Sequence, residues 1–160
     1  MGRDCFKEVT AEYVELMKLI DEYHKQLNLL KLVKQLNSSA ELEKLLKRNK
    51  ERLARQIIRM AKITLNKYDA ICRQLGLSSK CLYGKAALAD LLLHVDFTAG
   101  LRKTLCYVGL YQPNNGRYNH RLRMAAQSLA ISYYRKRRVR AKEVRQLLKK
   151  IKQIMAGGPA

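Results

Sequence analysis

The chain has 160 residues, and its 33 Lys and Arg against 13 Asp and Glu give a formal net charge of +20. The length fits one domain, and a hydrophobic content of 48% excludes a disordered basic tail. The charge points to a polyanionic partner, most often nucleic acid, and two prolines and eight glycines favour a mostly helical chain.

Targeting and metal-binding patterns are missing from the sequence. No apolar run approaches the ~18–20 residues of a transmembrane helix, and the N-terminus lacks a signal-peptide stretch. We therefore expect a cytoplasmic protein without a membrane partner. The four cysteines lack zinc-ligand spacing, which favours reduced, mostly buried thiols over a disulfide or a metal site. Because no phosphate loop, dinucleotide fingerprint or H-E-x-x-H motif occurs, we expect no cofactor, no metal and no catalytic residue.

The first predicted helix covers residues 1–36. Its apolar residues alternate three and four apart from Phe6 to Leu30, which makes a heptad seam of nearly four repeats. Two interpretations are open: a helix packed inside a bundle, or a contact helix between subunits. The second is attractive because residues 1–41 are almost neutral on a very basic protein.

The second predicted helix covers residues 38–76. Ser38 with Glu41 fits an N-terminal capping box, and Gly76 fits a C-terminal stop. On a helical wheel, one face is apolar and the opposite face carries a stripe of basic side chains with little acid to balance it. The stripe consists of Lys44, Arg48, Arg52, Arg55, Arg59 and Lys62. Since like charges one turn apart repel, bound phosphate would relieve the stripe, and we weigh that contact against a plain solvated face.

The third predicted helix covers residues 79–109 and is the most apolar, as expected of a central helix. Asp90 and His94 lie one turn apart within it. A buried hydrogen-bonded pair is favoured over a proton-transfer dyad because no nucleophile motif accompanies them. Gly100 permits a close helix contact or a bend.

The fourth predicted helix covers residues 116–155, after a turn at 112–116, and residues 156–160 form a disordered tail. Residues 135–152 hold ten basic side chains and one acid, and Tyr133 and Tyr134 precede them. Either tyrosine is a candidate for base stacking or for the core. The basic cluster contains Arg135, Lys136, Arg137, Arg138, Arg140 and Lys142.

These elements predict an all-α protein: a single domain over residues 1–155, built as an antiparallel four-helix bundle with a long basic C-terminal helix. Positive charge concentrates in residues 42–77 (+7) and 113–160 (+12). Binding of nucleic acid through both basic surfaces, tolerant of base sequence, is the expected function.

Short motifs in a fixed order also make the chain similar to a known family. Between residues 50 and 136 it resembles the accessory variability determinant of diversity-generating retroelements, a relative of the four-helix proteins of ribosomal intervening sequences. The motifs are Glu51-Arg52 before Gln56-Ile57, Ala89-Asp90, Tyr118-x-His120, and Tyr133-Tyr134-Arg135-Lys136. The expected Phe-Pro and Trp are missing, and the chain past Arg137 is additional.

The resemblance implies a noncatalytic protein that assembles as a pentameric barrel of four-helix bundles. It also implies two partners, the reverse transcriptase of the element and its template RNA, in support of mutagenic retrohoming. The alternative is a helical RNA-binding subunit of another ribonucleoprotein, such as the small subunit of a CRISPR effector or a ribosome-associated protein. DNA stays open as a ligand beside RNA.

Overall fold

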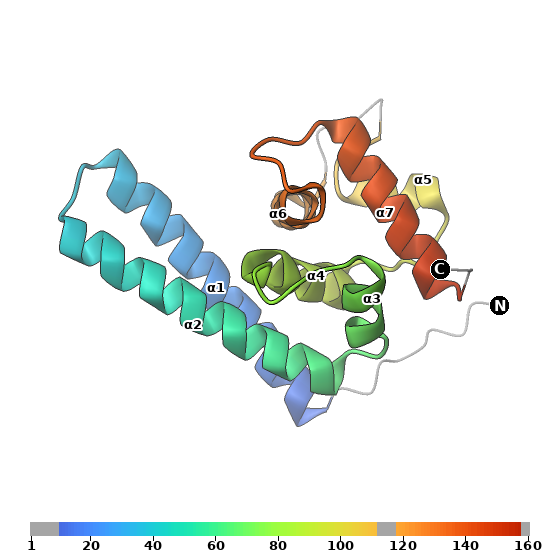
Figure 1. The fold of residues 1–160 in the computed structure, drawn as a ribbon, viewed down its shortest axis with the longest axis horizontal. Coiled ribbons are helices and arrows are strands. Elements are labelled where there is room, and N and C mark those ends of the chain that lie inside the picture. Colours follow the sequence, from blue (N-terminus) through green and yellow to red (C-terminus); the bar gives the residue numbers. More distant parts are fainter. Residues whose placement is uncertain (1–9, 112–117, 158–160) are drawn as a thin grey trace. The chain divides into compact units, whose positions relative to one another are not determined.

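The computed structural model describes residues 10–111 and 118–157. Within these stretches the chain is all-α, with seven helices and no strand (Figure 1). The predicted fold class is thereby confirmed, whereas the four-helix bundle is not. The helices fall into two compact units, a hairpin unit (residues 1–64) and a C-terminal unit (residues 65–160). No helix among the described residues combines the length and the apolar character needed to cross a membrane.

The hairpin unit consists of α1 (Ala11–Gln35) and α2 (Ala40–Thr64), which run antiparallel and pack along one another (Figure 1). The hydroxyl of Thr10 caps α1 by accepting a hydrogen bond from the Tyr13 backbone N–H at 3.2 Å. The cap of α2 is Ser39, whose hydroxyl accepts from the Leu42 N–H at 3.1 Å. The N-cap therefore lies one residue after the predicted Ser38, and Leu42 occupies the N3 position, where a capping box requires Glu or Gln.

Most of the described part of the heptad seam is buried, and its other members, Tyr13 and Leu27, are half-buried. Leu16, Ile20, Tyr23 and Leu30 of α1 are each at most 7% exposed. The apolar side of α2 is also buried, through Leu46, Leu53, Ala54, Ile57 and Ala61. Phe6 and the first residues of the predicted helix 1–36 lie outside the described residues. Since most of the seam is buried, it does not supply a free contact surface.

The helix predicted over residues 38–76 is interrupted. It ends at Thr64, and α3 (Tyr68–Gln74) begins after Lys67, whose φ of 66° is left-handed. The apolar spacing continues across the break, so periodicity does not reveal it. The predicted stop is confirmed: Gly76 has a φ of +65°, and the Leu77 N–H donates to the Cys72 carbonyl at 2.9 Å, as in a Schellman motif.

The helix predicted over residues 79–109 is also two helices, α4 (Leu82–His94) and α5 (Leu101–Tyr107). The carboxylate of Asp96 accepts hydrogen bonds from the Thr98 N–H at 2.9 Å and from the Thr98 hydroxyl at 2.5 Å. This local turn competes with the helix. Gly100 then serves as the N-cap of α5, so it marks a bend.

The helix predicted over residues 116–155 divides into α6 (His120–Tyr134) and α7 (Ala141–Met155). Arg135 adopts a left-handed φ of 54° and ends α6. A helix carried through Arg135–Arg140 would stack like charges one turn apart, which disfavours it. The predicted turn at residues 112–116 lies outside the described residues, as do the last residues of the tail.

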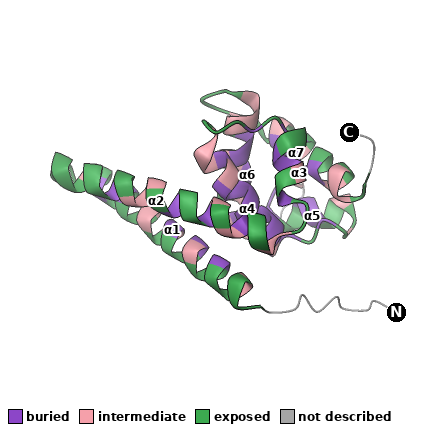
Figure 2. Ribbon diagram, turned by 60° about the horizontal axis from the view of Figure 1, so that its bottom comes forward, coloured by how far each residue is buried: buried purple, intermediate pink, exposed green. Residues whose placement is uncertain are grey.

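The core of the C-terminal unit forms where α4 packs on α6. Most of α4 is buried (Figure 2). Gly84 permits the close approach, because a Cβ added there would lie 2.4 Å from the Cβ of Ser132 on α6. The apolar side of α7 closes the unit with Val144, Leu147, Leu148 and Ile151, all at most 1% exposed.

Candidate nucleic-acid interface

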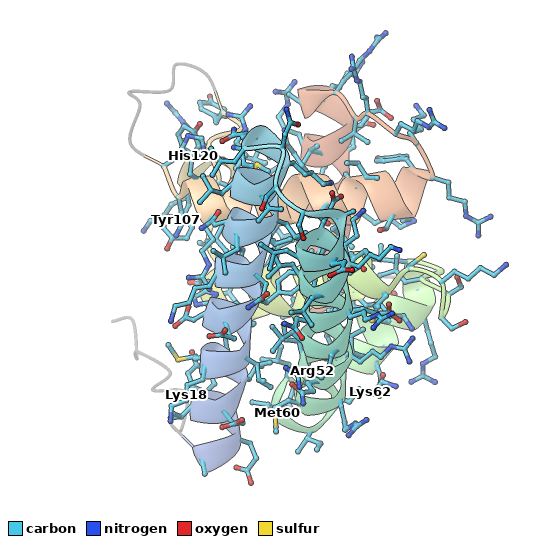
Figure 3. The ribbon with its side chains drawn as sticks, turned by 90° about the vertical axis from the view of Figure 1, so that its left-hand side faces the viewer. Lys18, Arg52, Met60, Lys62, Tyr107 and His120 are labelled. Carbon is cyan, nitrogen blue, oxygen red and sulfur yellow. The ribbon has the colours of Figure 1, made fainter. Side chains whose placement is uncertain are left out.

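The amphipathic character of α2 positions the predicted basic stripe. Leu53 and Ile57 fix one side of the helix in the interior, so residues about half a turn away face solvent. All six residues of the predicted stripe are exposed. Figure 3 labels Arg52 and Lys62 on α2, and it places Lys18 on the side of α1 away from α2.

Four of these six side chains line one groove of about 440 Å³. We call it the α2 arginine groove, lined by Arg48, Glu51, Arg52, Arg55, Gln56 and Arg59. At a rise of ~1.5 Å per residue, Arg48 and Arg59 are about 16 Å apart along the helix. Lys44 and Lys62 are exposed beyond the two ends and do not line the groove.

Two lining residues, Glu51 and Gln56, were not among the predicted site residues. The Glu51 carboxylate accepts a hydrogen bond from the Arg55 guanidinium at 2.6 Å, with side chains 46% and 66% exposed. The i,i+4 spacing of Glu51 and Arg55 in the sequence could have predicted this ion pair. One of the four guanidinium groups of the groove therefore already has an anionic partner.

A second i,i+4 pair, Glu43 with Lys47, lies about two helical turns before the Glu51–Arg55 pair on α2. The Lys47 ammonium and the Glu43 carboxylate are 2.8 Å apart, and the hydrogen bond from Lys47 lowers the pKa of Glu43. Neither residue lines the groove. This pair matches the Glu51–Arg55 pair in spacing and therefore serves as its natural control.

The second predicted cluster forms the α6–α7 basic turn, which we define as residues 135–142. Its six predicted basic residues are all exposed, but most lie in the connection between two helices rather than on one continuous helix. Glu143 orders the turn: its carboxylate accepts from the Arg140 backbone N–H at 3.2 Å and from the Lys136 ammonium at 2.8 Å. The hydrogen bond from Lys136 is the main cause that lowers the pKa of Glu143.

Tyr133 and Tyr134 flank this turn and pack edge to face, with ring centroids 4.8 Å apart. Both are partly exposed, so neither is a core residue. The Tyr134 hydroxyl donates to the Glu143 carbonyl at 3.1 Å, and the Lys150 ammonium donates to the Tyr133 hydroxyl at 2.8 Å. Both rings are therefore held in place by the residues around the turn.

Several cations of the C-terminal unit donate hydrogen bonds to backbone carbonyls, and of these Lys67 is exposed whereas Arg123, Arg145 and Lys152 are half-buried. Lys67 donates to the Met155 carbonyl at 2.9 Å, and Arg123 donates to the Gly109 carbonyl at 3.0 Å. Arg145 and Lys152 do the same, to the carbonyls of Leu110 and of Phe97 and Ala99. The charge of +12 in residues 113–160 therefore overstates the surface available to a polyanion.

Asp90 and His94 form the predicted pair. Asp90 is 3% exposed, and the His94 Nδ1 atom lies 2.9 Å from the Asp90 Oδ1 atom. The hydrogen bond to Asp90 raises the pKa of His94. The His94 ring also lines a 230 Å³ cavity with Lys103 and Tyr107. The buried carboxylate and its short hydrogen bond to the imidazole fit the predicted buried pair.

Among the described residues, no group of three His, Cys, Asp or Glu side chains could hold a metal ion. Cys72, Cys81 and Cys106 are thiols outside any disulfide, and they are buried, half-buried and exposed respectively. The expectation of mostly buried thiols therefore does not hold for Cys106. Cys5 lies outside the described residues.

Comparison of the chain with protein-family models, with curated proteins and with solved structures finds no match.

Proposed function

We propose that the protein is a noncatalytic nucleic-acid-binding accessory protein whose α2 arginine groove holds the phosphate backbone. The observation that carries this proposal is the lining of the groove, where four guanidinium groups meet a single carboxylate. Guanidinium forms bidentate, charge-assisted hydrogen bonds with phosphate, which a lysine ammonium does not match in geometry.

The dimensions of the groove support a polymer rather than a single anion. A row about 16 Å long spans several nucleotides at about 3.4 Å of rise per nucleotide. Contacts between arginine and phosphate oxygens carry no information on base sequence, so we expect little dependence on it. The α6–α7 basic turn supplies a second contact surface, with Tyr133 beside it as a candidate for stacking.

The finer part of the proposal rests on the family resemblance. We propose template RNA as the nucleic acid, a reverse transcriptase as the protein partner, and a homo-oligomer as the working assembly. The residues that carry the resemblance include Arg52 and Gln56, which lie on the wall of the groove, and Arg135 and Lys136, which open the basic turn.

The test is RNA binding measured by fluorescence anisotropy between low and physiological salt. The double variant Arg55→Glu with Arg59→Glu should lose about tenfold or more in affinity, because it removes two phosphate contacts and adds two carboxylates to the groove, and its binding should also depend less on salt. The control is Lys31→Glu with Lys34→Glu, which makes the same change in net charge on the exposed surface of α1. Equal losses in the two double variants, with helical circular dichroism unchanged, would remove the groove from the proposal.

The partner is tested separately, by isolating the tagged protein from its own cells and sequencing the RNA that accompanies it. A template RNA together with a reverse transcriptase supports the finer proposal. Ribosomal or CRISPR RNA would instead favour the ribonucleoprotein-subunit alternative, and an RNA-free protein that ignores added oligonucleotides would refute both.

A further inference from the structure

A small cavity lies at the junction of α4 and α5 in the C-terminal unit, and we call it the α4–α5 cavity. Its volume is about 230 Å³, and its lining includes His94, Asp96, Ala99, Lys103, Thr104 and Tyr107. Pockets for drug-sized ligands measure about 300–1,000 Å³. The cavity therefore suits a group of the size of a phosphate or a single ring, and not a length of polymer.

Asp90 fixes the orientation of the His94 ring beside the cavity. The Asp90 carboxylate lies 2.9 Å from the His94 Nδ1 atom, and the Asp90 carbonyl oxygen lies 3.1 Å from it. Both oxygens accept hydrogen bonds, so Nδ1 carries the proton of the neutral ring and Nε2 is the nitrogen left for a ligand. The hydrogen bond to Asp90 raises the pKa of His94, although burial and the charge of Arg121 act against it. The protonated ring offers its Nε2–H to an anion.

The connection between α4 and α5 forms one wall of the cavity and is held in place. The Thr104 hydroxyl, 3% exposed, donates to the carbonyls of Asp96 and Gly100, with oxygen–oxygen distances of 3.4 and 3.3 Å. The Asp96 carboxylate accepts hydrogen bonds from the backbone N–H and the hydroxyl of Thr98. The one carboxylate in the lining is therefore already hydrogen-bonded within its own turn.

Positive charge surrounds the cavity from three helices. Lys103, which is exposed on α5, is part of the lining. On α6 the charge of Arg121 acts on His94, and on α7 the Lys152 ammonium donates to the carbonyl of Ala99, a lining residue. With the protonated imidazole these make four cations, against the two carboxylates described above. The balance of charge favours an anionic ligand.

We propose that the α4–α5 cavity binds a phosphomonoester, held by the Nε2–H of His94 and the ammonium of Lys103. A phosphomonoester carries about −1.5 to −2 charges at pH 7, whereas each phosphodiester inside a strand carries one. It occurs at the end of a strand or on a free nucleotide, which suits a cavity too small for a continuing chain. Tyr107, which is 47% exposed and labelled in Figure 3, also lines the cavity, where its ring can stack on an attached base.

This site goes beyond the phosphodiester contacts proposed for the α2 arginine groove. The two sites share no lining residue, and they lie on different helices. Variants of one site therefore test it without altering the other.

The experiment is an NMR titration of the histidine ring signals in the full-length protein, with those of His94 assigned by their loss in His94→Gln. Inorganic phosphate and uridine 5′-monophosphate are added at constant ionic strength, and uridine is the phosphate-free control. Both phosphates should shift the His94 signals and raise the pKa of His94, because an anion at Nε2 stabilises the imidazolium. The signals of His24, on α1, should not respond.

The dependence of this binding on pH follows from the two partners. Affinity should rise above about pH 6, where a phosphomonoester loses its second proton. It should fall again as pH rises through the folded-state pKa of His94, where the imidazole loses the proton that it donates.

Lys103→Ala tests the second contact without touching the buried pair. It should weaken the binding of both phosphates by about tenfold or more, since it removes a charge-assisted hydrogen bond. Lys149→Ala, at an exposed position on α7 outside the cavity, is the control and should leave binding unchanged. Circular dichroism checks that each variant is folded.

Two single-stranded RNAs that differ only in a 5′-phosphate or a 5′-hydroxyl distinguish the sources of the ligand. A preference for the phosphorylated RNA that Lys103→Ala abolishes identifies a strand end, and equal affinities with binding of the monophosphate identify a free nucleotide. Unchanged His94 signals at about 10 mM phosphate, ten times a millimolar dissociation constant, would overturn the proposal. An equal response to uridine, or phosphate binding that Lys103→Ala does not weaken, would overturn it as well. RNA binding by the α2 arginine groove would survive each of these results.

Discussion

Replacing Glu51 with glutamine should strengthen RNA binding. Its carboxylate is held 2.6 Å from the guanidinium of Arg55, and it is the one acidic group that lines the α2 arginine groove. Glutamine keeps the size and the helix propensity of the side chain while removing the charge. The change therefore frees Arg55 for a phosphate without adding a cation.

The size of the effect follows from the geometry in two ways. A phosphate bound to Arg55 would lie about 6 Å from the Glu51 carboxylate, where repulsion in water is about 0.7 kcal/mol, or about threefold in affinity. One additional phosphate contact on a single strand also steepens the salt dependence by about 0.7 logarithmic units per tenfold change in salt, which is about fivefold. We therefore expect a gain of about three- to fivefold at low salt, and a smaller gain as salt rises.

The assay is fluorescence anisotropy with one labelled single-stranded RNA over a series of salt concentrations. Glu43→Gln is the matched control, because it removes the same charge from another i,i+4 pair on the same helix, with Lys47, outside the groove. Its effect should stay below about twofold, since the added positive charge acts only at longer range. Equal gains in both variants would show that net charge, and not the groove, sets affinity, and no gain for Glu51→Gln would refute the assignment of Arg55.

Three further changes test the fold. Gly84→Ala should lower the free energy of unfolding by about 1–2 kcal/mol, because its Cβ meets Ser132 at 2.4 Å, and a thermodynamic cycle with Ser132→Gly should show positive coupling. Ser39→Ala should cost about 1 kcal/mol in urea unfolding through loss of the α2 cap. The raised pKa of His94 contributes stability that is complete below about pH 6.5 and is lost as pH rises through the folded-state pKa; Asp90→Asn should abolish that loss and lower the pKa of His94 in an NMR titration.

Apolar and polar periodicity in the sequence was enough to predict the all-α class and the two faces of α2, and the preference of helix C-termini for glycine predicted the stop at Gly76. The three helix breaks could not be found in this way. At Lys67 and Arg135 the chain turns through a left-handed φ without a glycine, while the apolar spacing continues past the turn. The break before α5 did have a local signal, since Asp96 followed by Thr98 is a pattern that forms a side-chain turn.

The candidate site was predictable to the same degree. Helical spacing alone brought Arg48, Arg52, Arg55 and Arg59 to one groove, because all four lie on one continuous helix. The cluster from Arg135 onward was predicted on a helix but lies mainly in a turn. Repulsion between like charges disfavours a helix at this run, and the sequence alone does not show whether the helix continues or breaks there. Counting charges also could not distinguish exposed cations from those, such as Lys152, that bind carbonyls.

The cations that bind carbonyls have a practical consequence for preparing the protein. At about 1 M sodium chloride the Debye length is about 3 Å, so contacts between exposed arginines and a bound polymer are strongly weakened. The hydrogen bonds from Arg123 and Lys152 to main-chain oxygens are short-range and part-buried, and they do not depend on a partner carboxylate. A wash of the protein at high ionic strength should therefore release bound nucleic acid while the helices of the C-terminal unit stay assembled, without any need for a chaotrope.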